Sequence, residues 1–327
     1  MKVSILGAGS WGTALAIHLA RTGHAVYLWG RDAEVAASIT ATRHHPRRFT
    51  DLEIPSAVQA TSSLSDAVAQ AETIVLSVPC ASLRSVLEAA AFPPGPRRFL
   101  STGKGIEPDT GRRMSEILRD YVAGSRVAAL SGPTFAEGIA RGDPSAAVIA
   151  DSGEGLAREL QQSFSSPQFR LYSSDDLVGV ELAGALKNVV AVAAGIVSGL
   201  GYGHNTLAAL VTRGLAEIGR IVRGKGGQPR TVAGLAGIGD LMLTCTGMQS
   251  RNRRVGEEIG KGRKLAEILL EMPEIAEGPR TCLAVPKLAK EVGVEAPIAE
   301  AVVQVLYEDI PPRTAVENLM TRTLRPE

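Results

Sequence analysis

The residue best suited to acid–base chemistry is a lysine inside an apolar segment. Lys187 lies in residues 177–197, a stretch with helical spacing that is apolar almost all round, and no acidic residue follows it nearby. Burial disfavours the charged form of an amine and lowers its pKa. A lysine tuned in this way can exchange protons near neutral pH. The alternative is a surface lysine at a domain junction, and the residues alone leave both open.

A glycine-rich segment near the start of the chain has the spacing of a dinucleotide site. Gly7, Gly9 and Gly12 fit the pattern G-x-G-x-x-G, directly after an apolar run at residues 3–6 and directly before a helical pattern. In that context the glycines make a tight turn, let the backbone approach a pyrophosphate, and let helix and strand pack closely. The anion would lie at the helix N-terminus, where unpaired N–H groups and the helix dipole favour it. The alternative is a glycine-rich turn without a ligand.

The end of the next apolar run, residues 25–29, indicates which dinucleotide is bound. NAD sites usually carry an acidic residue there for the ribose hydroxyls, whereas an arginine accommodates a 2′-phosphate. The chain has Arg31 followed by Asp32. Arg31 can pair with that phosphate or stack on adenine. We therefore expect NADP, while Asp32 keeps NAD open.

A second anion site is predicted in the other half of the chain. Ser250, Arg251 and Asn252 open a predicted helix and are followed by two more arginines. A guanidinium, short polar side chains and free backbone N–H groups together suit a phosphate, although a basic first turn is often simply solvated. Asp240 lies in a predicted glycine-rich turn at residues 237–240. Its carboxylate could accept a substrate hydroxyl proton, hold Lys187 or bond its own backbone.

Alternating strands and helices are predicted for the first half of the chain. Short, nearly continuous apolar runs are typical of strands in a sheet that is covered on both faces. They lie at residues 3–6, 25–29, 73–78, 98–101, 127–130 and 146–150, with helical patterns at 12–21, 64–71, 81–91 and 112–121. This order predicts an α/β fold with a Rossmann-like, doubly wound parallel sheet.

From residue 175 onward the strand signal almost disappears. Helical patterns occupy residues 177–197, 206–223, 251–260, 264–270, 281–291 and 298–307. We therefore place a domain boundary at residues 174–184. The expected domains are a nucleotide-binding domain of residues 1–180 and an all-α substrate-binding domain of residues 181–327.

Composition and charge exclude several classes of protein. The 327 residues are 45% hydrophobic and 21% charged, as in a globular protein that needs no disulfides to fold. The formal net charge of +1 argues against a protein that coats nucleic acid or an anionic membrane. Three cysteines without metal-ligand spacing indicate buried thiols in a reducing cytoplasm. The apolar run at residues 188–202 is short for a membrane span and contains three glycines, so we expect a buried helix.

Taken with these motifs, the chain resembles the bacterial NAD(P)-dependent sn-glycerol-3-phosphate dehydrogenases over nearly its full length. The resemblance is carried, in this order, by GAGSWGTALA at 7–16, STGKGI at 101–106, LSGPTFA at 130–136, ELAGALKN at 181–188, GIGDLMLTCT at 237–246, SRNRR at 250–254 and EG at 277–278. Residues 42–54 depart from the usual family segment, so no contact is transferred to them.

The resemblance implies a reaction and a set of site residues. It implies interconversion of sn-glycerol 3-phosphate and dihydroxyacetone phosphate by hydride transfer with NADP or NAD, which supplies glycerol 3-phosphate for phospholipid synthesis. It implies that Lys187 accepts the proton during oxidation and donates it during reduction. Implied substrate contacts are Lys104, Gly132, Thr134, Lys187, Asp240, Ser250, Arg251 and Asn252. Implied cofactor contacts are Ser10, Trp11, Lys104, Ala136, Arg251, Ile275 and Glu277, in addition to Gly7, Gly9, Gly12 and Arg31.

Two other functions would share parts of this pattern. A ketopantoate- or hydroxyacid-type reductase would share the architecture, but a carboxylate-only substrate would not require Ser250, Arg251 and Asn252 in this form. A non-catalytic NADP sensor would keep the glycines without needing Lys187. A metal site at His44 and His45 is rejected, because no further ligand cluster supports it. We expect a phosphorylated triose as partner, no nucleic acid and no membrane insertion, and the apolar second domain is compatible with a homodimer.

Overall fold

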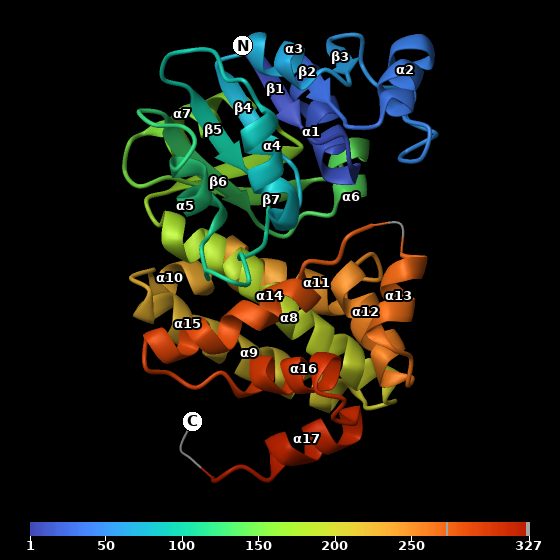
Figure 1. Cartoon of the computed structure of the whole chain (residues 1–327), viewed down its shortest axis with the longest axis vertical. Coiled ribbons are helices and arrows are strands. Elements are labelled where there is room, and N and C mark those ends of the chain that lie inside the picture. Colours follow the sequence, from blue (N-terminus) through green and yellow to red (C-terminus); the bar gives the residue numbers. More distant parts are fainter. Residues whose placement is uncertain (273, 325–327) are drawn as a thin grey trace. The chain divides into compact units, whose positions relative to one another are not determined.

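The computed structural model describes residues 1–272 and 274–324, and the chain divides into two compact units (Figure 1). The first unit contains Met1–Gly103 and Arg113–Val180. The second contains Lys104–Arg112 and the chain from Glu181 onward. The short segment Lys104–Arg112 thus belongs with the C-terminal half, which the order of elements in the sequence did not indicate.

One eight-stranded sheet forms the centre of the first unit, with strand order β3-β2-β1-β4-β5-β6-β7-β8. Its strands are β1 (Lys2–Leu6), β2 (Ala25–Trp29), β3 (Val58–Thr61), β4 (Thr73–Leu76), β5 (Arg98–Ser101), β6 (Arg126–Ser131), β7 (Ser145–Ala150) and β8 (Phe169–Ser174). All neighbouring strands are parallel except β6 and β7. The predicted α/β class and Rossmann-like sheet are confirmed, with the antiparallel pair as a correction to a fully parallel sheet.

Two strands, β3 and β8, were not predicted, because they lie at the two edges of the sheet. β3 has the sequence VQAT and buries only its first residue fully. In β8, FRLYSS, buried and more exposed positions alternate. A continuous apolar run marks a strand that is covered on both faces, and neither edge strand has one.

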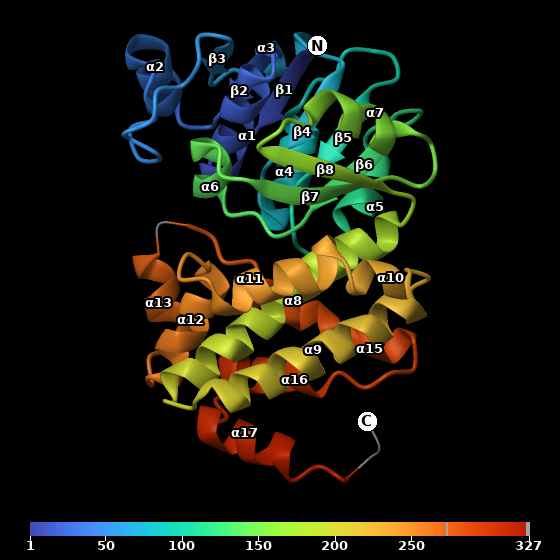
Figure 2. The same cartoon turned by 180° about the vertical axis from the view of Figure 1, so that it is seen from behind.

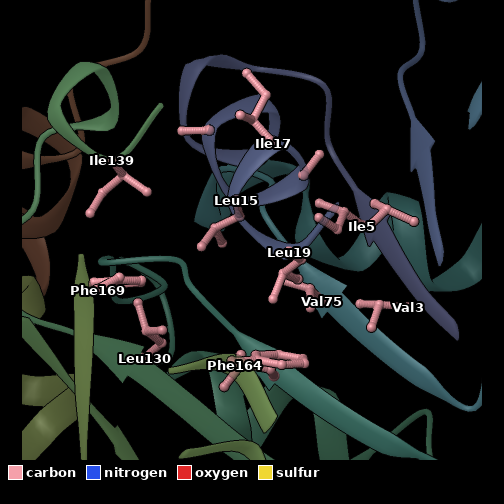
Figure 3. Close-up of a cluster of buried hydrophobic side chains, with 14 of the residues drawn as sticks. Val3, Ile5, Leu15, Ile17, Leu19, Val75, Leu130, Ile139, Phe164 and Phe169 are labelled. Carbon is pink, nitrogen blue, oxygen red and sulfur yellow. The ribbon is translucent and has the colours of Figure 1, made fainter. Parts of the chain in front are cut away.

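Helices cover both faces of this sheet. They are α1 (Ser10–Arg21), α2 (Ala33–Thr42), α3 (Leu64–Ala69), α4 (Leu83–Ala89), α5 (Met114–Arg119), α6 (Ala136–Arg141) and α7 (Leu156–Phe164). Successive strand residues point to opposite faces, so Val75 belongs to one core cluster while Ile74 and Leu76 belong to another. Figure 3 shows the first cluster, in which Leu15 and Leu19 of α1 lie among side chains of the sheet and α7. The sequence did not predict α2, α6 and α7, which bury no more than four side chains each.

The second unit contains helices and no strand among its described residues (Figure 2). Its helices are α8 (Leu177–Gly199, which begins in the first unit), α9 (His204–Gly224), α10 (Pro229–Val232), α11 (Asp240–Thr246), α12 (Arg251–Gly260), α13 (Leu265–Glu271), α14 (Gly278–Thr281), α15 (Val285–Glu291), α16 (Pro297–Tyr307) and α17 (Pro312–Met320). The predicted all-α character is confirmed. One correction concerns the glycine-rich turn predicted at residues 237–240, which is helical instead. Leu235–Gly239 is a π-helical turn that runs directly into α11.

Helix α8 is the single helix, among the described residues, that is long and apolar enough by itself to cross a membrane. A second candidate arises only if Pro229–Thr246 and Arg251–Gly260 are joined across a bend of 47°. The most apolar window of α8 is completely buried inside the structure. This burial is typical of the core helix of a globular domain, as the glycines in the sequence indicated.

Helices α8 and α12 cross with their backbones in contact, because each presents two glycines four residues apart. A Cβ on Gly195 would lie 2.0 Å from a backbone oxygen of α12, and a Cβ on Gly256 would lie 1.9 Å from a backbone oxygen of α8. One turn further on, a Cβ on Gly199 would lie 2.9 Å from the Gly260 Cα. This crossing fixes where the N-terminus of α12 lies relative to Lys187 on α8.

We predict that Gly256→Ala destabilises the second unit. The new methyl group would meet backbone rather than a movable side chain, and overpacking of this kind costs about 1–3 kcal/mol. Urea unfolding measures the loss. Gly219→Ala is the matched control, because Gly219 lies inside α9 with its nearest neighbour 3.8 Å from the added Cβ, so alanine should stabilise the helix. A Gly256→Ala variant as stable as the wild-type chain would contradict this account of the crossing.

Candidate active site

The glycine turn of the first unit has the shape that a dinucleotide pyrophosphate requires. Gly7 has φ +125°, and its N–H donates to the Trp29 carbonyl at 2.9 Å. A Cβ on Gly12 would lie 1.8 Å from the Gly7 oxygen, so only glycine lets α1 pack against the turn. A Cβ on Gly9 would meet no atom within 4 Å, which leaves the approach to the start of α1 open. Ser10 and Trp11 follow in the first turn of α1, and the turn therefore fits the phosphates of NAD or NADP.

Three further predicted residues follow strand β6. Gly132 comes directly after the strand, and its backbone runs close to β7, since a Cβ there would lie 2.8 Å from the Ala147 Cα. The Thr134 hydroxyl donates to the Gly132 carbonyl at 3.2 Å, and Ala136 begins α6. Because β1, β2, β4, β5 and β6 are parallel, these residues lie at the same edge of the sheet as the glycine turn and the exposed Arg31.

In the second unit, Lys187 is buried and its amine is held by two oxygens. Its Nζ donates to Asp240 Oδ1 at 2.5 Å and to the Thr244 hydroxyl at 2.6 Å. Lys187 is 5% exposed. Burial, the largest effect, lowers the pKa of Lys187 to about 8, with the charge of Lys104 acting in the same direction and that of Asp240 opposing it. An amine with this pKa is present in both protonation states near neutral pH.

Asp240 lies between two lysines. Its Oδ2 accepts from Lys104 Nζ at 2.7 Å while Oδ1 accepts from Lys187, and its side chain is 1% exposed. Burial alone would raise the pKa of Asp240, but the charges and hydrogen bonds of Lys104 and Lys187 outweigh burial and hold the pKa below its ordinary value. Asp240 is therefore an ionised carboxylate. The sequence left three roles open for the Asp240 carboxylate: accepting a substrate proton, holding Lys187 or bonding its own backbone. In the structure it accepts a hydrogen bond from Lys187.

Two residues of this cluster were missed by the sequence analysis. Thr244 stands four residues after Asp240 on α11, where it faces the same side of the helix, and its hydroxyl contacts the Asp240 carbonyl oxygen at 2.6 Å. Recognising a helix at 240–246 would have revealed this pair. Asn188 follows Lys187 on α8, and its side-chain N–H donates to the Lys104 carbonyl at 2.8 Å. The neighbouring Cys245 is buried, which raises the pKa of its thiol to about 12 and keeps it protonated.

The predicted phosphate-binding segment begins α12. Ser250 is the N-cap, and its hydroxyl accepts from the Arg253 N–H at 3.2 Å. Asn252 is buried, and its Nδ2 donates to Asn188 Oδ1 at 2.9 Å while its Oδ1 accepts from the Gly278 N–H at 2.8 Å. These bonds connect the start of α12 to the residue that follows Lys187. The half-exposed Arg251 lies 3.7 Å from the Glu274 carboxylate.

The remaining predicted cofactor contacts lie just before α14. Ile275 is 48% exposed, and Glu277 is half-buried as the N-cap residue of α14. Gly278 packs so closely on α8 that a Cβ there would lie 2.6 Å from the Asn188 carbonyl oxygen. The second unit thus brings Lys104, Lys187 and Asp240 into direct contact, and it connects Asn252 and Gly278 to them through Asn188.

Known proteins match both halves of the chain. The model of the NAD-dependent glycerol-3-phosphate dehydrogenase N-terminus matches residues 2–157, and the model of its C-terminus matches residues 176–317. A glycerol-3-phosphate dehydrogenase [NAD(P)+] of Pelodictyon phaeoclathratiforme is 45% identical over 100% of this chain and 99% of that relative. The chain belongs to the glycerol-3-phosphate dehydrogenase family. A member from Koribacter versatilis, also named with NAD(P)+, is 48% identical over 98% of this chain and 97% of its own length.

Solved structures agree with this family membership. The crystal structure of the glycerol-3-phosphate dehydrogenase from Coxiella burnetii has a TM-score of 0.93 and 35% identity, covering 98% of this chain and 99% of that one. A ketopantoate reductase from Ralstonia eutropha has a TM-score of 0.64 at 19% identity, covering 98% of this chain and 100% of that one. The second likeness reflects the shared fold alone.

We predict that Asp240→Asn destabilises the chain strongly. The substitution leaves two lysine side chains close together without the carboxylate between them, and loss of one partner of a buried ion pair costs about 3–5 kcal/mol. Urea unfolding at neutral pH measures the change. Asp309→Asn is the control, because that carboxylate pairs with Lys264 at the surface and its loss should leave the unfolding midpoint unchanged. Equal midpoints for Asp240→Asn and the wild-type chain would show that the carboxylate does not hold the cluster together.

Proposed function

We propose that this chain interconverts sn-glycerol 3-phosphate and dihydroxyacetone phosphate, with Lys187 as the group that exchanges the hydroxyl proton. The observation that carries the proposal is the buried amine of Lys187, fixed by Asp240 and Thr244, in a chain of this family. In a cell this activity would supply glycerol 3-phosphate for phospholipid synthesis in the cytoplasm.

The hydrogen bonds of Lys187 leave one position on its amine nitrogen where a proton can be accepted. A neutral amine has two N–H bonds and one lone pair. Asp240 Oδ1 and the Thr244 hydroxyl can take the two N–H bonds, which turns the lone pair towards a third direction. The proton of the substrate C2 hydroxyl would enter there, and the same ammonium would return it during reduction.

Asp240 and Lys104 would tune this exchange. The ionised Asp240 stabilises the ammonium that forms when Lys187 takes the proton, while Lys104 holds the other carboxylate oxygen and keeps the negative charge in place. Lys104 and Asp240 also carry polar atoms beside the Lys187 amine, so we assign both as contacts of the substrate hydroxyl groups.

For the substrate phosphate we assign Ser250, Arg251 and Asn252 at the start of α12. Arg251 is half-exposed and supplies a guanidinium, the side chain best matched to a phosphate. Asn252 already gives its oxygen and one N–H to the protein, so one N–H of its amide serves the ligand. Gly132 and Thr134 are assigned as further substrate contacts.

For the cofactor we assign the turn Gly7–Gly12 with Ser10 and Trp11, together with Arg31, Lys104, Ala136, Arg251, Ile275 and Glu277. The bound nicotinamide takes the hydride that leaves C2 of glycerol 3-phosphate. The relatives' names include both NAD+ and NADP+, and the exposed Arg31 after β2 supports our proposal that NADP is preferred. Residues 1–180 would form the cofactor domain and residues 181–327 the substrate domain, with Lys104–Arg112 added to the latter.

The alternatives have less support. A ketopantoate- or hydroxyacid-type reductase shares only the fold, and a non-catalytic NADP sensor would not need the buried pair of Lys187 and Asp240. We also propose that the chain forms a homodimer, because its helical unit exposes large apolar side chains such as Met248, Leu270 and Met320. Light scattering on the purified chain gives its mass directly.

We predict that purified chain mixed with dihydroxyacetone phosphate and NADPH consumes NADPH, and that Lys187→Ala abolishes this turnover. Without the amine no group delivers the proton, whereas NADPH should bind the variant almost as well as the wild-type chain. Absorbance of NADPH measures the rate, and quenching of protein fluorescence measures NADPH binding. Lys264→Ala, a surface variant, should keep full activity. A Lys187→Ala variant that keeps more than about a tenth of the wild-type rate would end the assignment.

A further inference from the structure

The segment between α2 and β3, residues 43–57, contains most of the stretch at residues 42–54 that departs from the family pattern, yet the structure anchors it firmly. We call it the α2–β3 loop. At its start Arg43 adopts the left-handed conformation with φ 59°, and its guanidinium donates to the carbonyls of Ile54, at 2.9 Å, and Pro55. Further along, Asp51 accepts from Arg141 of α6 at 2.9 Å. Arg43 therefore ties the start of the loop to its end, and Asp51 ties its middle to α6.

His45 attaches the α2–β3 loop to the glycine turn. The side chain is buried, and its Nε2 lies 3.0 Å from the Ala8 carbonyl oxygen, between Gly7 and Gly9 in the sequence. Its Nδ1 accepts from the backbone N–H of Arg47 at 3.1 Å. These partners define the tautomer, because Nδ1 accepts and Nε2 must donate. His45 thus places Arg47 at a fixed position beside the turn that holds the pyrophosphate.

Arg47 in turn holds the acidic residue that follows β2. Its guanidinium donates to Asp32 Oδ2, and Asp32 Oδ1 accepts from the Glu34 N–H at 2.9 Å as the N-cap of α2. The side chains of Arg47 and Asp32 are 57% and 42% exposed, so a ligand can reach the pair. The hydrogen bond from Arg47 is the main reason that the pKa of Asp32 lies below its ordinary value.

This pairing changes what the position after β2 can recognise. A free carboxylate there accepts hydrogen bonds from the ribose hydroxyls of NAD and repels the 2′-phosphate of NADP. Both oxygens of Asp32 are engaged, one by Arg47 and one by the backbone of α2. The carboxylate is therefore neutralised, and Arg47 together with the exposed Arg31 presents positive charge to a ligand.

We propose that Arg47 is a specificity-determining residue that selects the 2′-phosphate of NADP(H), with His45 as the residue that positions it. The proposal rests on the proposed function in one respect, namely that the glycine turn binds a dinucleotide. It extends that function by explaining how a chain with an acidic residue after β2 can prefer NADP. It also gives the α2–β3 loop a role that its sequence did not reveal.

The test compares the dissociation constants of NADP+ and NAD+, two ligands that differ only in the 2′-phosphate, by calorimetry on the intact chain. Arg47→Ala should weaken NADP+ binding about tenfold or more, because a charge-assisted contact is lost and Asp32 is unmasked. NAD+ binding should stay the same or become tighter. Asp32→Asn combined with Arg47→Ala should recover part of the NADP+ affinity. Arg119→Ala is the control for charge, since α5 packs beside β6, away from the β3 edge.

Three other outcomes of these binding measurements would contradict the proposal, each for a different reason. If Arg47→Ala weakens NADP+ and NAD+ equally, the residue only supports the fold of the loop. If neither affinity changes, Arg47 does not contact the ligand. If the wild-type chain binds neither dinucleotide, the proposed function itself has failed. His45→Ala should lower the ratio of NADP+ to NAD+ affinity. His45→Gln, whose side chain can also accept and donate, should keep part of that ratio.

Discussion

A single buried carboxylate organises the chemistry of this chain. Asp240 accepts from Lys104 on one oxygen and from Lys187 on the other, so one buried negative charge pairs with two lysines. If the carboxylate were absent, the buried amine of Lys187 would lose its counter-charge, and its neutral form would be favoured still further. With it present, the Lys187 amine is held in place while its pKa stays close enough to neutral for proton exchange.

Helix packing makes this arrangement possible. The glycines of α8 and α12 allow the two backbones to touch, which brings the start of α12 to the same part of the unit as Lys187. Asn188 and Asn252 then connect the backbone of Lys104 to Gly278 through three hydrogen bonds of 2.8–2.9 Å. One continuous set of polar contacts therefore joins the backbone of Lys104, the start of α12 and Gly278.

Much of the fold and part of the candidate site could be predicted from the sequence, and each exception has a physical reason. Apolar runs identified six strands of the sheet. The apolar helix around Lys187 made a buried amine one of two interpretations, and its burial became evident only from the structure. The choice among three roles for Asp240 could not be made, because its partners lie 53 and 136 residues away along the chain. No local apolar pattern marks the edge strands β3 and β8 or the α2–β3 loop. These elements are stabilised by tertiary contacts instead.

The pKa of Lys187 tests the account most directly. Lysine labelled with ¹³C at Cε allows the side-chain signal to be followed by NMR across a pH titration, and Lys187→Met identifies which signal belongs to Lys187. We expect a midpoint of about 8, set by burial against the attraction of Asp240. A midpoint at the ordinary lysine value of 10.5 would contradict it, because the amine would then be fully charged wherever the enzyme works.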